Sequence, residues 1–331
     1  MVTLISQCSQ NEAVRRRELE AVMLLAQSDM ADSLAAVASF EAALSGFLGF
    51  TACVTTSSDT AALSVMAGAM GLLPGDEVLI SPDVSAWVAA ALVHDGMTLR
   101  LIDYVPGTLH IDALKLKENL TDRSRLVILS SHFSFPDHEA VVQDLCRLHS
   151  VIPVVEVTAS CLADPERMTR VAGFDIALIS LREGRSTLST GEGGALFYRR
   201  DDWARKAKSF SQFSDLDGVH QGVNHKLSGI QCALGQVRLA VLAGTVSAVP
   251  DEWKQHREWC ERFKITGFAL PEPYLPSGWI IEKHVAAAHE VPYLPLPVLT
   301  GFPASYSSAV PEAQKMCHKW VMLPLGVRVA A

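Results

Sequence analysis

The chain of 331 residues lacks the features that mark several large classes of protein. No apolar run reaches the roughly 18 residues that a membrane helix requires. Only 19% of residues are charged, and 28 Lys and Arg against 36 Asp and Glu give a net charge of −8, which argues against a disordered chain and against a nucleic-acid-binding surface. The charges near the N-terminus follow a short apolar patch, the reverse of a signal peptide. We therefore expect a soluble, cytoplasmic protein with no membrane and no nucleic-acid partner.

Several catalytic and metal-binding motifs are also missing. The seven cysteines are scattered and never form C-x-x-C, so neither a disulfide framework nor a zinc site is expected. The eleven histidines do not form H-E-x-x-H, and there is no G-x-S-x-G or G-x-G-x-x-G. A metal site, a hydrolase elbow and a dinucleotide-binding fingerprint are therefore unsupported.

What the sequence does contain is an alternation of short apolar runs with helical stretches. A first helix carries an apolar stripe from Leu34 to Phe47 and is expected to end at Gly46 and Gly49. A second long stripe, from Leu227 to Val241, predicts a helix used for core or dimer packing. Strands are expected at 52–56, 77–81, 99–103, 125–131, 152–157 and 175–180, and helices at 59–72, 85–94 and 138–149. Such alternation predicts an α/β fold with a mostly parallel sheet and ligands at the carboxyl ends of the strands.

The domain organisation follows from a change of composition. After residue 245 Pro, Trp and Tyr become frequent, as in PEPYLP and VPYLPLPVL. We expect a large domain over residues 1–245 and a small, irregular C-terminal domain over residues 246–331.

Three loops that follow strands have unusual composition. The first, 55–60, leads into a helix. Either its hydroxyl and N–H groups hold a phosphate, or it has only a structural role in which Ser58 or Asp59 caps the helix. A phosphate about 4 Å from the Asp59 carboxylate meets a like charge. The repulsion costs roughly 4 kcal/mol per charge pair at an effective dielectric constant of about 20. The second loop, 180–194, offers Arg182 and Arg185 as an anion clamp, or is a solvated hairpin with paired surface charges. The third, 157–161, follows a buried acid, Glu156, for which a structural role is favoured.

Seven blocks taken together resemble one family. They occur in the order TSSDTAAL (56–63), GLLPGDEVLISP (71–82), LIDYVPGTLHID (101–112), SSHFSFPDHEAV (130–141), PVVEVTASC (153–161), STGEGGALFYRRD (189–201) and VNHKLSGIQCALGQVRL (223–239). The chain resembles the DegT/DnrJ/EryC1/StrS aminotransferases over about residues 35–245. The resemblance implies a fold-type-I, three-layer α/β/α large domain with a reduced C-terminal region. It also implies pyridoxal phosphate (PLP) chemistry on nucleotide-linked keto sugars, in polysaccharide or antibiotic pathways.

The catalytic lysine that the resemblance implies is absent. It lies five residues before the first Gly of the GEGG block, which places it at Ser186, or at Arg185 if shifted by one. A hydroxyl forms no imine, and a guanidinium is protonated. No lysine occurs between Lys117 and Lys206, so no near neighbour replaces it.

Other family positions have changed as well. The aspartate that pairs with the ring nitrogen falls on Val157, and the following Gln or His falls on Ser160. The phosphate loop Ser-Gly-Thr reads Ser-Asp-Thr, with Asp59 in place of glycine. The resemblance also implies an aromatic residue that stacks on the ring. Only Trp87 matches it, and Trp87 is slightly out of register.

Some features that the resemblance implies are kept. Ser58 and Thr60 match the phosphate loop, and Ser180 lies one position from the serine that precedes the lysine loop. Asn224 matches the asparagine that reaches the phosphate from the neighbouring subunit. These residues form a vestigial pocket in a protein whose dimer is expected to be kept.

We therefore expect a degenerate, non-transaminating homologue without a cofactor. It acts as a dimeric scaffold, either a homodimer or a heterodimer with an active paralogue, with a sugar nucleotide as a candidate ligand. One alternative is an altered PLP- or pyridoxamine-phosphate (PMP)-dependent enzyme, such as a dehydratase with Glu183 as its base. A second alternative is a true aminotransferase whose lysine lies at another position of the sequence. A third is a new activity in which Arg182 and Arg185 face the cleft.

Overall fold

The computed structural model describes residues 12–132, 136–158, 161–163, 165–183, 188–213, 222–246, 278–288, 294–296 and 310–324, with residues 254, 258, 261, 262 and 299. Their helices are α2 (Glu12–Ala26), α3 (Met30–Leu48), α4 (Asp59–Ala69), α5 (Ala86–His94), α6 (Ala113–Asn119), α7 (Pro136–Leu148), α8 (Pro165–Val171), α9 (Asp201–Phe210), α10 (Gly229–Val246), α12 (Lys283–Ala288) and α13 (Pro311–Lys319). None of these helices combines the length and the apolar character needed to cross a bilayer.

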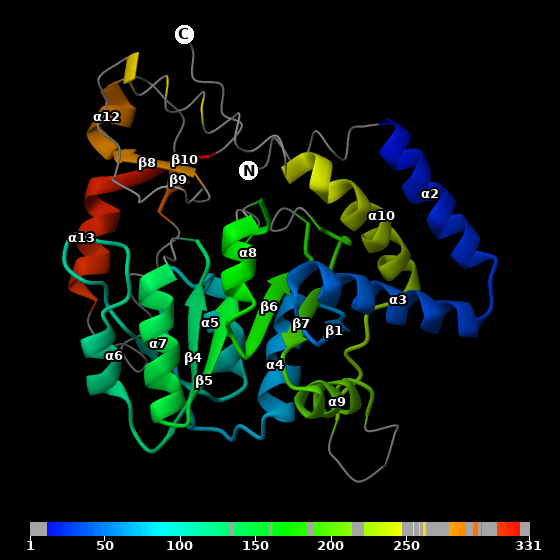
Figure 1. Ribbon diagram of the computed structural model, residues 1–331, viewed down its shortest axis with the longest axis horizontal. Helices are drawn as coiled ribbons and strands as arrows, with labels where there is room; N and C mark the ends of the chain where they lie inside the picture. The colour runs from blue at the N-terminus through cyan, green and yellow to red at the C-terminus, as the bar shows by residue number, and fades with distance from the viewer. Residues whose placement is uncertain are drawn as a thin grey trace.

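A seven-stranded sheet forms the centre of the molecule (Figure 1). Its strands are β1 (Ala52–Thr56), β2 (Glu77–Ile80), β3 (Thr98–Leu101), β4 (Ser124–Ser130), β5 (Ile152–Glu156), β6 (Ile176–Ser180) and β7 (Gly194–Tyr198). Their spatial order is β1-β7-β6-β5-β4-β2-β3, and β7 runs antiparallel to both of its neighbours. The other six strands run in one direction, so their carboxyl ends meet at a single edge. The prediction of a mostly parallel sheet is confirmed, and this edge is where ligands of such sheets bind.

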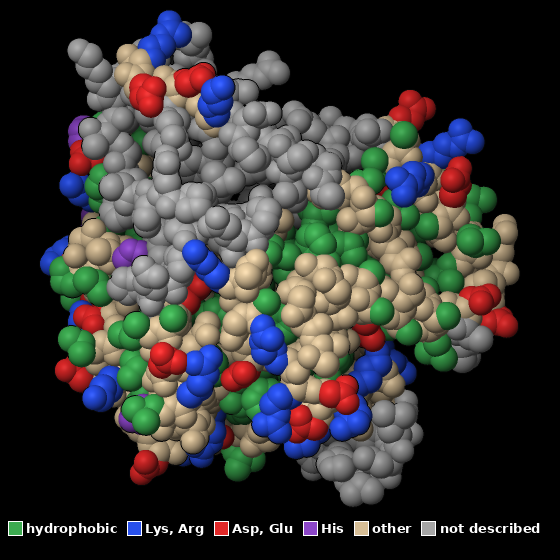
Figure 2. Space-filling view, in the orientation of Figure 1, with side chains coloured by type: hydrophobic (Ala, Val, Ile, Leu, Met, Phe, Trp, Pro, Cys, Tyr) green, Lys and Arg blue, Asp and Glu red, His purple; other side chains and the backbone are tan. Residues whose placement is uncertain are grey.

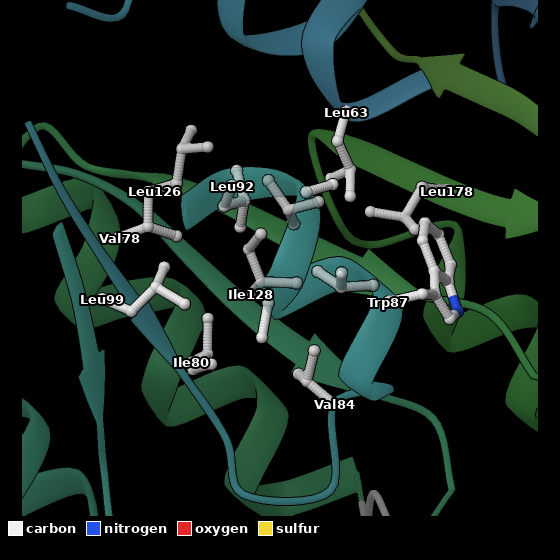
Figure 3. Packing of buried hydrophobic residues seen from close by; sticks show 14 of the residues in the cluster. Leu63, Val78, Ile80, Val84, Trp87, Leu92, Leu99, Leu126, Ile128 and Leu178 are labelled. Carbon is white, nitrogen blue, oxygen red and sulfur yellow. The ribbon is translucent and has the colours of Figure 1, made fainter. Parts of the chain in front are cut away.

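Helices cover both faces of the sheet and complete three layers. On one face, strand residues such as Ile128 and Leu178 pack with Leu63 of α4 and Leu92 of α5 (Figure 3). On the other, Phe197 lies among residues of α3, α7, α8 and α10. Because both faces are buried, the strands are near-continuous apolar runs, the signal by which the sequence predicts them.

One detail of the predicted helices is wrong. Gly46 lies inside α3, and the helix ends at Gly49, whose φ of +72° suits glycine. Leu34 and Ile230, which belong to the two predicted apolar stripes, are 64% and 47% exposed. Hydrophobic side chains do reach the surface where α3 and α10 lie (Figure 2). The cause is that the first turns of both helices extend beyond the sheet that their later turns cover.

The C-terminal segments form a second, three-stranded sheet of β8 (Gly278–Glu282), β10 (Trp320–Pro324) and β9 (Leu294–Pro295), in that order. They share the core of the large sheet, since Ile280, Val310 and Met316 are buried in the same cluster as the residues of α4 and α5. Asp103, 2% exposed, accepts hydrogen bonds from the backbone N–H groups of Glu312 and Ala313, each at 3.0 Å. The start of α13 is thus fastened directly beside β3.

Candidate functional site

The loop between β1 and α4 lies at the carboxyl edge of the sheet and carries three of the predicted residues. Ser58 is the N-cap of α4, in extended conformation, and its Oγ accepts a hydrogen bond from the N–H of Ala61 at 3.0 Å. Its Oγ also lies 3.1 Å from Thr60 Oγ1. The interpretation of Ser58 as a helix cap is therefore confirmed.

Asp59 is buried at the first helical position, with 3% exposure. Its Oδ1 accepts from the N–H of Thr60 at 2.8 Å, and its Oδ2 accepts from the Ser180 hydroxyl at 2.9 Å. Ser180 is the last residue of β6, so the carboxylate joins the start of α4 to the end of a strand 121 positions away in sequence. The sequence predicts Asp59 and Ser180 as neighbours of one pocket but gives no sign that they bond each other.

The backbone of this loop is fixed from two further sides. The N–H of Ser57 donates to the carbonyl of His225 at 2.8 Å. A Cβ placed on Gly194 would lie 2.6 Å from the carbonyl oxygen of Ser58, so only glycine permits the first residue of β7 to approach so closely. The loop is therefore held as a rigid turn.

A hollow with a volume of about 610 Å³ lies on the flank of this turn. Its wall includes Ser58 and Thr60 from α4, the α5 end at His94 and Asp95, and His225. Ser64, which also lines it, donates to Asp95 Oδ2 at 2.7 Å. Sequence reasoning missed this hollow, because His94 reads as an ordinary helix-end residue.

The end of β5 places Glu156 and Val157 on opposite faces of the sheet. The Glu156 side chain, 3% exposed, accepts from the N–H of Ser85 at 2.8 Å, just before α5. Its predicted structural role is consistent with this bond. Val157, also 3% exposed, lies in the apolar cluster that contains Leu181 and Cys161. The position for which the resemblance implies an acid thus belongs to the hydrophobic core.

Trp87 does not present an open ring face. It is 8% exposed, belongs to the buried cluster between the sheet and α4–α5, and points toward Leu178 of β6 (Figure 3). Its indole therefore fills the space over the strand itself.

The connection from β6 to β7 is a hairpin between antiparallel strands. Arg182 forms an ion pair with Glu192 at 3.2 Å, and both side chains are about half exposed. This pair agrees with the solvated-hairpin interpretation. Glu183 is exposed as well. Arg185, Ser186 and Ser160 lie outside the described residues, so their predicted roles remain predictions.

Asn224 lies on the segment that leads into α10. It is exposed and forms an isolated antiparallel bridge with Gln212, while Lys226 forms one with Thr56 at the end of β1. The segment that carries Asn224 therefore runs past the α4 turn of its own chain. Within the part of the chain that the structure describes, no group of three or more His, Cys, Asp or Glu is placed to hold a metal ion.

The sheet order with its single antiparallel strand, and the loop at the start of α4, define an aminotransferase-type α/β protein. The chain belongs to the DegT/DnrJ/EryC1/StrS aminotransferase family, whose model matches residues 12–259. GDP-perosamine synthase of Caulobacter vibrioides is 27% identical over 210 residues, which are 61% of this chain and 56% of that protein. The chain spans about half the length of the curated relatives that it matches.

Solved structures of low sequence identity show the same fold. NtdA of Bacillus subtilis, with bound cofactor PMP, superposes with a TM-score of 0.75 at 17% identity over 100% of this chain and 80% of that one. A variant of GDP-4-keto-6-deoxymannose-3-dehydratase with bound GDP-perosamine gives 0.75 at 15% identity, over 94% and 93%. The fold-type-I expectation is confirmed.

The described residues do not fit the cofactor that the resemblance implies. Two first-turn N–H groups of α4, those of Thr60 and Ala61, already donate to Asp59 and Ser58, so they are not directed at an added phosphate. Val157 offers no charge to a protonated ring nitrogen, and Trp87 is packed against β6. We therefore derive no catalytic step that passes through PLP.

Proposed function

We propose that this chain is a non-transaminating member of its family that acts as a dimeric partner protein in nucleotide-sugar metabolism. Relatives include GDP-perosamine synthase and a spore coat polysaccharide biosynthesis protein, and a sugar nucleotide is the ligand class that we assign to this chain. We also propose the division into a large domain, 1–245, and a reduced C-terminal domain, 246–331. The second sheet supports this division.

The single observation that carries the proposal is the environment of Val157. A PLP ring acts as an electron sink only while its nitrogen is protonated, and a carboxylate beside it keeps it so. Val157 instead lies among Leu181, Cys161 and Leu188, each 3% exposed or less. A charged ring nitrogen placed against these side chains would lose its hydration without gaining a partner.

The positions of the lysines also support a protein that does not transaminate. None occurs between Lys117 and Lys206. Lys208 donates to both carboxylate oxygens of Glu41, and Lys115 forms an ion pair with Asp103. Lys226 is exposed and its backbone bridges Thr56, which makes it the residue to examine if an imine is ever found.

Addition of PLP to the purified protein is expected to give no stoichiometric aldimine, because the stretch between Lys117 and Lys206, which includes the implied lysine position, contains no lysine. The measurement is the absorbance after dialysis, followed by borohydride reduction and peptide mapping. The sugar aminotransferase Spr1654 of Streptococcus pneumoniae, whose structure is known in a PLP form, serves as the positive control.

A yellow colour that survives dialysis and maps to one lysine contradicts the proposal. Lys226→Ala then tests whether that lysine is the one beside β1. Random, substoichiometric labelling of surface lysines that is unchanged in Lys226→Ala agrees with the proposal.

The dimer is supported by apolar side chains left at the surface of one end of the molecule. Gly229 contacts Ser33, so Leu34 and Ile230 lie at neighbouring first turns of α3 and α10. Leu19 and Met23 of α2, which packs on α10, are 59% and 50% exposed. Exposed apolar surface of this kind is typical of an interface, and α10 follows directly on the segment that carries Asn224.

The variant Leu34→Asp/Ile230→Asp is expected to weaken self-association at least tenfold, because it buries two carboxylates in the proposed interface. Sedimentation at micromolar concentration measures this. Leu114→Asp, at a 73% exposed position of α6, is the control and is expected to leave the dimer intact. A wild-type chain that sediments as a monomer contradicts the homodimer.

A further inference from the structure

We propose that Asp59 is a built-in anion, whose carboxylate occupies the anion-binding position at the start of α4 and keeps a phosphate group out of it. The start of a helix attracts anions because its first N–H groups lack helical partners and the helix dipole is positive there. In α4, an eleven-residue helix, a side chain of the same helix supplies this anion.

The carboxylate is bonded as a bound phosphate oxygen would be. One oxygen accepts a backbone N–H, from Thr60 at 2.8 Å. The other accepts a hydroxyl from a separate element, Ser180 at the end of β6, at 2.9 Å. With 3% exposure, Asp59 is sealed between α4 and β6 and does not extend into solvent.

Two further N–H groups of the turn also have acceptors within the protein. The N–H of Ala61 donates to Ser58 Oγ at 3.0 Å, and the N–H of Ser57 donates to the carbonyl of His225 at 2.8 Å. The backbone of β7 at Gly194 closes one side of the turn. A phosphate would therefore have to displace these acceptors and also lie beside a buried negative charge.

Asp59 acts on the phosphate group and not on an aldehyde, so its effect is separate from whether the chain transaminates. Pyridoxine 5′-phosphate tests it cleanly, because this compound has the phosphate and the ring but no aldehyde and forms no imine. Inorganic phosphate tests the cradle without the ring.

The experiment compares wild type with Asp59→Gly, which removes the carboxylate and leaves the turn's N–H groups in place. At constant ionic strength, set with chloride, calorimetry is expected to show at least tenfold tighter binding of pyridoxine 5′-phosphate to the variant. The melting temperature of Asp59→Gly is expected to fall and then to rise with added phosphate, while that of wild type stays unchanged, because only a ligand of the native state stabilises it.

Three variants serve as controls. Ser180→Ala keeps the carboxylate and is expected to stay closed to phosphate. Asp59→Asn keeps the side-chain volume without the charge and is expected to gain less than Asp59→Gly. Asp59→Ala provides a second open variant, since alanine is a better helix former than glycine.

Two results overturn the proposal. One is wild-type binding of pyridoxine 5′-phosphate as tight as that of Asp59→Gly. The other is no gain of binding in Asp59→Gly and Asp59→Ala when circular dichroism shows both to be folded. An imine found with PLP in the wild type contradicts the proposed function and leaves this comparison intact.

Discussion

Asp103→Ala is expected to lower the free energy of unfolding by about 3 kcal/mol, because it leaves buried donors without an acceptor. The N-cap position of α13 is Val310, whose side chain forms no capping bond. Asp103 supplies the missing cap from more than 200 positions away, one carboxylate oxygen for the N–H of Glu312 and the other for that of Ala313. A carboxylate at this place also complements the helix dipole.

Lys115→Met separates the cap from the ion pair at the same carboxylate. Lys115 Nζ lies 3.3 Å from Asp103 but its side chain is 37% exposed, so its loss is expected to cost less than about 1 kcal/mol. Urea unfolding gives both values, and hydrogen exchange at Glu312 and Ala313 shows whether α13 detaches first. Equal losses for the two variants would mean that the ion pair, and not the cap, fastens the C-terminal region.

The strands of the large sheet are the part of the fold that the sequence predicts best. A strand buried on both faces is an apolar run such as that of β4, and for six of the seven strands, all but β7, the expected and observed bounds agree within two residues. Helix α2 was not predicted, because its contacts are made with α10. The Arg238–Glu18 ion pair at 2.8 Å joins residues that are 220 positions apart, and no local pattern shows such a partner.

The sequence predicts which residues lie at the candidate site, but not the hydrogen bonds that they form with one another. The charge conflict at Asp59 is visible in the sequence, since an acid beside a phosphate is unfavourable wherever it stands. That Ser180 donates to this acid, or that His225 receives the N–H of Ser57, depends on which strand ends the sheet order brings together. That order is set by crossovers and core packing over the whole domain.

The ion pair behind the site loop is another long-range arrangement of this kind. Lys208 of α9 donates to both oxygens of Glu41 on α3, each at 2.8 Å. Glu41 Oε1 also accepts from the backbone N–H and the hydroxyl of Thr55, at 2.9 and 3.0 Å. This network anchors β1 directly before the turn that carries Ser58 and Asp59.

Lys208→Met is expected to destabilise the protein by about 3 kcal/mol, because it leaves the mostly buried Glu41 carboxylate without its cation. Two nearby thiols report the opening of this region. Burial, and next the Glu41 carboxylate, raises the pKa of Cys53 well above its usual value and that of Cys232 to about 12, so both react with thiol reagents only after the structure opens. Labelling of the variant is expected to be on the order of 100-fold faster, which corresponds to that loss.

The matched control is Lys206→Met on the same helix, where the lysine is exposed and its removal is expected to change stability by less than about 0.5 kcal/mol. Glu41→Gln in the Lys208→Met background removes the unpaired charge and is expected to restore part of the lost stability, because the two positions are coupled. If Lys208→Met and Lys206→Met label at the same rate, the ion pair does not hold β1 in place. The turn at Asp59 is then held in place by its other contacts, those with Ser180, Gly194 and His225.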